Sequence, residues 1–234
     1  MTRTFRTLHK WVALVLAAQF VAWMASGLAL SLVDHDAANG EPHRRAADAS
    51  ARPWPAGVRS PVALVAASAG RVQRVETAWL GERPVYRLVD DERTWLLDAA
   101  SGRPVKIDAA LAGALAAADY AGPGAASAPE WLAEAPREAI DHAPPLWRVR
   151  FADDVDTTLY LSAVDGRVLE RRNAQSRWFE LFWMLHTMDY SGRGDFNHPL
   201  VIVSAAGGLF AALTGAWLLV ALLRRRPRRP AVGA

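Results

Sequence analysis

The six histidines are the residues of this chain best suited to metal or cofactor chemistry. His9 precedes a long uncharged stretch, whereas His186 and His198 precede a second one. The chain has no cysteine, which excludes disulfides, iron–sulfur clusters, thiolate zinc sites and covalently attached c-type haem. Any metal or cofactor must therefore use histidine, carboxylate or backbone ligands. The histidines for which we expect solvated surface roles, in a linker or beside prolines, are His35, His43 and His142.

Residues 176–190 predict a helix with an aromatic face around His186. Spacings of three and four residues place these side chains on it: Phe179, Phe182, Trp183, His186 and Tyr190. An imidazole at membrane depth is costly and needs a partner. A neutral histidine in a dry apolar pocket is what b-type haem requires, so we predict His9, His186 and His198 as axial ligands of haem iron. The alternative is interfacial anchoring and hydrogen bonding by all three.

Small residues recur within both uncharged stretches. Gly207, Ala211 and Gly215 form one stripe, and a second contains Ala18, Ala22 and Ser26. Such stripes allow close packing of helices, or they leave clearance for a porphyrin.

Helix geometry limits how the histidines could share iron. His9 and His198 lie at opposite ends of their stretches, about 30 Å apart at a rise of 1.5 Å per residue, so they cannot ligate one iron. An inner bis-histidine haem would need His9 from two chains or a partner subunit. His186 and His198 could pair within one chain or across a dimer. Two helices enclose haem poorly, so haem binding predicts a homodimer or hetero-oligomer.

The uncharged stretches, residues 11–33 and 199–223, exceed the roughly 20 residues that a helix needs to cross a bilayer. We therefore predict two transmembrane helices. Basic residues precede the first and follow the second, which by the positive-inside rule places residues 1–10 and the basic tail 224–234 in the cytoplasm. Residues 34–198 would lie in the periplasm of a bacterium whose inner membrane holds the chain. The first stretch is too long for a typical cleaved signal peptide.

The periplasmic part predicts an α+β domain that begins after a linker, residues 34–57. Ser60 and Pro61 signal the start of a short helix that ends at Gly70. Three strand patterns follow, around 72–80, at 85–89 and at 94–97, with turns between them. We assign residues 58–107 to this first unit.

A second unit, residues 108–173, repeats the pattern. A helix is expected at 108–119, followed by strand patterns at 146–151 and 158–162 and then by residues 164–168. The Gly-Arg pair at 102–103 recurs at 166–167, which indicates an internal repeat of a helix followed by an antiparallel sheet. Residues 129–140 fit either helix or strand. Residues 174–198 would form an interfacial aromatic helix and loop.

These features resemble the PepSY domains. The resemblance rests on Tyr86-Arg-Leu88, on the segment from Trp95 to Arg103, and on two flanking segments. Those flanks, Arg6-Thr-Leu-His-Lys-Trp11 and Trp183-Met-Leu-His-Thr-Met-Asp-Tyr190, are similar to PepSY-associated transmembrane proteins. Larger members have four or more spans, so this chain would be a reduced, two-span version.

The resemblance implies two functions. Some PepSY-associated membrane proteins are similar to haem-dependent reductases that pass electrons outward to ferric siderophores. His9 and His186 match the family's histidine positions, and His198 matches more weakly. The first hypothesis is thus a haem b electron-transfer subunit for a periplasmic ferric chelate. The alternative is a non-enzymatic protein whose sheet edge binds or modulates a peptidase or other periplasmic partner. A third is an accessory role in metal uptake without redox chemistry.

The sequence contains no motif that indicates another function. No Gly-x-Gly-x-x-Gly follows a strand, so electrons would come from a quinone or a separate dehydrogenase. No basic stripe interleaved with aromatics indicates nucleic-acid binding, and the terminal arginines suit anionic lipid instead. The acidic turn with Asp153, Asp154 and Asp156 is expected to be solvated rather than to bind calcium.

Overall fold

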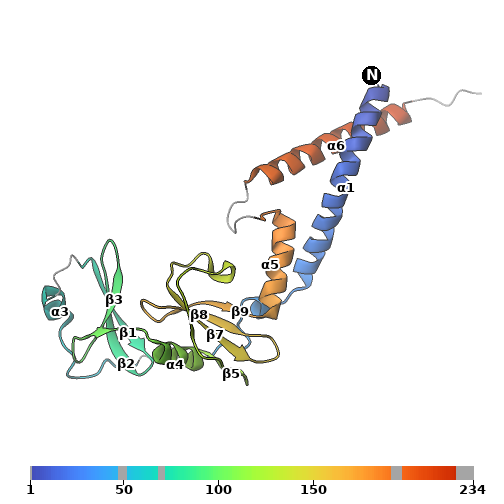
Figure 1. Ribbon diagram of the computed structural model, residues 1–234. Helices are drawn as coiled ribbons and strands as arrows, with labels where there is room; N and C mark the ends of the chain where they lie inside the picture. Colours follow the sequence, from blue (N-terminus) through green and yellow to red (C-terminus); the bar gives the residue numbers. More distant parts are fainter. Residues whose placement is uncertain (1, 47–51, 68–71, 191–196, 225–234) are drawn as a thin grey trace, which may run out of the picture. The chain divides into compact units, whose positions relative to one another are not determined.

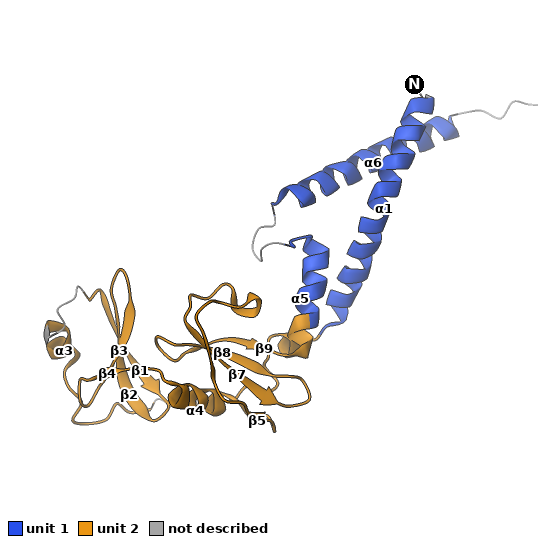
Figure 2. Cartoon of the chain, viewed as in Figure 1, with its two compact units in different colours: residues 1–33, 178–234 blue, residues 34–177 orange. Residues whose placement is uncertain are grey.

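The computed structural model describes residues 2–46, 52–67, 72–190 and 197–224. The chain divides into two compact units, coloured separately in Figure 2. Residues 1–33 and 178–234 form the helical unit, and residues 34–177 form the sheet unit. The fold is α+β, with one long apolar helix near each end of the chain, as the composition predicts.

The helical unit is built on α1 (Thr2–Leu32) and α6 (Pro199–Leu223). Both helices are long and apolar enough to cross a membrane. Many of their large apolar side chains are exposed; Val15 is 76 % exposed and Leu223 is 75 % exposed. The structure confirms the predicted start of α6, because His198 is its N-cap and Pro199 its first residue. The predicted tail beyond Arg224 lies outside the described residues.

Glycines of α6 lie against α1, and the two helices run close together near the N-terminal end of α1 (Figure 1). A Cβ at Gly207 would lie 3.2 Å from Leu16, and one at Gly208 would lie 3.3 Å from Phe20. The small-residue stripe of α6 therefore serves helix packing.

Helix α5 (Ala174–Thr187) carries His186. It ends three residues earlier than predicted, because Met188 has a positive φ of 56° that breaks the helical path. Tyr190 therefore lies beyond the helix, and the predicted five-residue aromatic face loses this member. The loop predicted at residues 191–195 lies outside the described residues.

The first half of the sheet unit begins with α3 (Pro61–Ala67); its predicted end at Gly70 lies outside the described residues. An antiparallel sheet follows in the order β1–β2–β3–β4. Its strands are β1 (Arg74–Leu80), β2 (Arg83–Val89), β3 (Thr94–Asp98) and β4 (Pro104–Val105). Leu64 of α3 packs with Tyr86, Leu88 and Leu97 in a core of this half.

The second half begins with α4 (Ala109–Asp119), whose N-cap Asp108 accepts a hydrogen bond from the amide of Leu111. The second sheet has the order β5–β7–β8–β9, and β6 also pairs with β7. Its strands are β5 (Ala125–Ala126), β6 (Glu130–Leu132), β7 (Leu146–Ala152), β8 (Thr158–Ser162) and β9 (Val168–Arg172). The ambiguous segment contains both β6 and a 3-10 turn, η1 (Arg137–Ala139). Residues 164–167 form the β8–β9 turn, and the last strand continues to Arg172.

The turns that close the two halves have the same geometry. The amide of Gly102 donates to the carbonyl of Asp98 at 2.8 Å, and the amide of Gly166 donates to that of Ser162 at 2.9 Å. Gly102 and Gly166 both have φ of 72°, a region that favours glycine. The two Gly-Arg pairs of the sequence therefore hold equivalent positions in the fold.

Helix α4 joins the two halves. Ala112 lies in a buried cluster with Leu80 and Val85 of the first sheet, whereas Ala116 lies in one with Val149 and Leu159 of the second. Small side chains on α4 thus let both sheets approach it closely.

Two turn glycines offer a direct test of this junction. Gly81 and Gly166 both have positive φ, but a Cβ at Gly81 meets nothing within 4 Å, whereas one at Gly166 would lie 2.8 Å from Leu80 and from Leu115. We expect Gly81→Ala to lower the free energy of unfolding by about 1 kcal/mol through backbone strain. Gly166→Ala should lower the free energy of unfolding by about 1–3 kcal/mol more than Gly81→Ala does, because its added methyl group overpacks the junction. Thermal unfolding of both variants measures the difference, and equal losses would contradict this packing.

Candidate functional site

His9 on α1 is held by α6. Its Nδ1 lies 2.8 Å from the hydroxyl of Thr214, and that hydroxyl donates to the carbonyl of Phe210 at 2.8 Å. Since a hydroxyl has one proton, the Thr214 oxygen accepts from His9, which places the proton of a neutral ring on Nδ1. The Nε2 lone pair is then available to bind a metal.

His186 has the same arrangement at the other end of α1. Its Nδ1 lies 3.3 Å from the hydroxyl of Ser26 and 3.3 Å from the carbonyl of Trp23. A carbonyl can only accept, and the Ser26 hydroxyl already donates to Ala22 at 2.6 Å. His186 therefore carries its proton on Nδ1 in the neutral form, and its Nε2 also presents a lone pair.

His198 differs from the other two. Its Nε2 lies 3.2 Å from the carbonyl of Thr187, so Nε2 is the protonated donor. In this arrangement its Nε2 is engaged at the end of α5, and the role the structure supports for His198 is to join α5 to the start of α6.

A glycine lies against each of the first two imidazoles. A Cβ at Gly215 would lie 3.1 Å from Cε1 of His9, and one at Gly27 would lie 3.2 Å from Cε1 of His186. A side chain at either glycine would press on the edge of the imidazole, so these positions allow close approach of the rings. The glycines and the Nδ1 acceptors together fix the orientation of both rings, as supporting groups do for histidines that bind metals.

The two imidazoles cannot share one iron within a chain. His9 and Ser26, the partner of His186, are separated by seventeen residues of α1, or about 26 Å at 1.5 Å per residue. Between them, the side-chain nitrogens Nε2 of Gln19 and Nε1 of Trp23 are buried, and no described residue accepts a hydrogen bond from either. Within the described part of the chain no three histidine or acidic side chains group as a metal site. The residues present thus fit a single axial nitrogen at each position.

The structure corrects the expectation of a solvated His43. Its Nδ1 donates to the Oδ2 of Asp153 at 3.0 Å, its ring packs edge-on against Tyr120, and its side chain is only 22 % exposed. The segment that follows is also fixed, because Arg44 forms an antiparallel β-bridge with Tyr120 and the amide of Arg45 donates to the backbone carbonyl of Asp119 at 2.7 Å. The first part of the expected linker is thus bound to the second half of the sheet unit.

Asp153 is the acceptor at the centre of this contact. The sequence predicted a solvated Asp153, but its side chain is buried. Its carboxylate also accepts from the hydroxyl of Tyr120 at 2.8 Å and from the amides of Thr157 and Val155. Burial acts to raise the pKa of the Asp153 carboxyl, but hydrogen bonds from Thr157, Tyr120 and His43 outweigh it and hold this pKa well below its usual range. Asp154 and Asp156 are exposed, so the turn does not gather three carboxylates.

His142 is also paired rather than solvated, with its Nε2 3.2 Å from Glu170. Nearby, Glu138 accepts from the hydroxyl of Tyr160 at 2.7 Å and from Nε of Arg177 at 2.8 Å. Burial together with Glu138 raises the pKa of Tyr160 to about 12. These contacts fix η1 against β8 and the first turn of α5, which is a structural role.

Comparison with known proteins gives no further guide to the site: no protein family, curated protein or solved structure matches this chain.

Proposed function

We propose that the chain is a membrane-bound haem b electron-transfer subunit that supports reduction of a ferric chelate, such as a ferric siderophore, or a similar acceptor outside the cytoplasm. The resemblance to PepSY-associated membrane proteins motivates the reaction class. The observation that carries the proposal is the shared geometry of His9 and His186, each with a hydrogen-bonded Nδ1 and a glycine at its edge. With the proton on Nδ1, the lone pair of each ring is on Nε2.

His9 and His186 would hold the iron, and haem b would supply one-electron redox chemistry when bound. Thr214 and Ser26 orient the two rings by accepting from Nδ1, which also raises the basicity of Nε2. The exposed apolar side chains of α1 and α6 would face lipid and exclude water.

One chain supplies one suitable nitrogen at each end of α1, so two axial histidines per iron require a second copy or a partner subunit. A homodimer would bring together His9 with its counterpart and His186 with its counterpart. Positions at both ends of a spanning helix suit a protein that carries electrons across the bilayer, from a quinol or a dehydrogenase to an outer acceptor.

Optical spectroscopy tests the proposal. Protein purified in detergent from haem-replete cells should show a b-type absorption band that sharpens on reduction, with a haem content near one per chain if each histidine pair binds one. Addition of a ferric chelate to the reduced protein should reoxidise it. Colourless protein from cells in which another b-type cytochrome is fully loaded would reject the proposal.

A further inference from the structure

A groove of about 570 Å³ lies in the sheet unit where its two halves meet. Residues 44–46 border it together with Arg52, Trp79 of β1, Leu115 of α4 and the β8–β9 turn. Its volume lies within the range of small-molecule sites, and ligand sites favour such junctions. None of the lining residues belongs to the helical unit.

Three arginines line the groove: Arg44, Arg45 and Arg52. Asp119 is the acidic residue of the lining, but Arg171 binds it through two nitrogens. Asp119 is thus already paired with a group outside the lining, as Arg44 and Arg52 are with Glu41 and Glu82. The arginines become available to a ligand when it displaces these glutamates.

The three arginines are held in different ways. Arg45 donates to the carbonyls of Ala118 and Tyr120, both at 3.0 Å, so it is fixed by the backbone. Arg44 pairs with Glu41 at 2.9 Å, and Arg52 pairs with Glu82, whose side chain is 93 % exposed. Exposed ion pairs contribute at most about 1 kcal/mol, so an incoming oxyanion can displace Glu41 or Glu82 at little cost.

Arg52 is also oriented by its surroundings. Its guanidinium lies 4.8 Å from the ring centroid of Trp79, and it donates to the carbonyl of Gly81 at 3.0 Å. A planar guanidinium fixed in this way is preorganised for a carboxylate, which it binds through two parallel hydrogen bonds. Leu115 and Val168 add apolar wall to the same groove.

We propose that this groove binds an organic anion that carries two or more carboxylates on an apolar body. The carboxylates pair with Arg44 and Arg52, and the body lies against the apolar wall. This site does not depend on the haem proposal, because it uses none of the same residues and needs no redox step.

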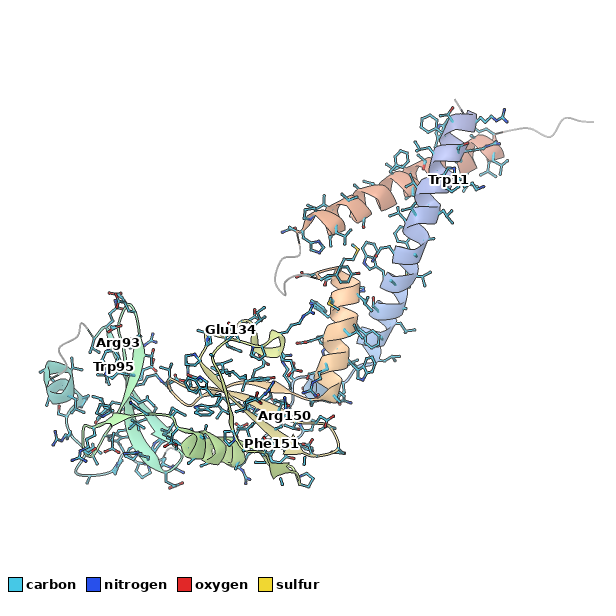
Figure 3. The ribbon with its side chains drawn as sticks, in the orientation of Figure 1. Trp11, Arg93, Trp95, Glu134, Arg150 and Phe151 are labelled. Atoms are coloured by element: carbon cyan, nitrogen blue, oxygen red, sulfur yellow. The ribbon has the colours of Figure 1, made fainter. Side chains whose placement is uncertain are left out.

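The test is calorimetric titration of the full-length protein in detergent with benzene-1,2,4,5-tetracarboxylate. We expect saturable binding that Arg52→Gln weakens roughly tenfold or more, the loss of one charge-assisted pair. The matched control is Arg93→Gln. Arg93, labelled beside Trp95 in Figure 3, lies 4.8 Å over the ring of Trp95 and pairs with Asp90, as Arg52 does with Trp79 and Glu82. Arg93 is not among the residues that line the groove.

Further titrations separate the proposed site from general anion binding. Citrate, which lacks an apolar ring, should bind more weakly than the tetracarboxylate, and the tetramethyl ester should not bind. Equal binding of inorganic phosphate would show an adventitious anion only and would overturn the proposal. Equal losses in Arg52→Gln and Arg93→Gln, or no binding by the parent protein, would overturn it as well.

Discussion

Replacement of Asp153 by alanine is expected to lower the free energy of unfolding of the sheet unit by about 3–5 kcal/mol. The substitution removes the acceptor of Tyr120, His43 and two backbone amides, so buried donors lose their partner together. The melting temperature should fall by roughly 10 °C or more. Near-ultraviolet circular dichroism of the full-length protein would follow this transition.

The neighbouring residue provides the control. Asp154 is exposed, so Asp154→Ala should change the free energy of unfolding by about 0.5 kcal/mol or less. A similar loss in both variants would mean that the turn matters only through its general charge, and that the contact with His43 contributes nothing specific.

The same contact predicts how acid acts on the protein. The pKa of Asp153 is lowered in the folded chain, so the carboxylate contributes its full stability above the unfolded value of about 3.9 and loses it as the pH falls toward the folded value. The melting temperatures of the parent and of Asp153→Ala should therefore converge below about pH 4. Asp98, whose pKa is lowered to about 2 by the Ser101 amide and by Arg83, adds an acid sensitivity common to both proteins.

Replacement of His186 by alanine is expected to remove about half of the bound haem, because one of the two proposed haem positions loses its histidines from both chains. The absorption band that remains should belong to the position at His9, and His9→Ala should leave the complementary half. Haem content per chain, measured after extraction, gives the result directly, and far-ultraviolet circular dichroism checks that the helices are retained.

His198→Ala is the matched control for that experiment, since the residue lies just before α6 and is also an imidazole. Its Nε2 is engaged by the carbonyl of Thr187, so its loss should leave the haem content unchanged. Retention of haem in His186→Ala combined with its loss in His198→Ala would contradict the assignment of axial nitrogens.

Local patterns in the sequence determined most of the secondary structure. The two apolar helices, the capped helix after Asp108 and the strands β3 and β8 all follow from periodicity and composition over neighbouring residues. The Gly-Arg pairs also marked the repeat, because each closes a hairpin with a glycine at positive φ. The short strands β5 and β6 were not predictable, since two or three residues carry no period and their pairing with β7 decides their conformation.

The tertiary structure alone decided which polar groups meet. His43 and Asp153 are 110 residues apart in sequence, and nothing local distinguishes them from solvated side chains. The sequence likewise predicted three histidines at the ends of the apolar helices, but only their contacts in the packed chain indicate Nδ1 as the donor in His9 and His186 and Nε2 as the donor in His198. Periodicity is a property of one element, whereas a hydrogen bond or an arginine-lined groove needs segments that only the packed chain brings together.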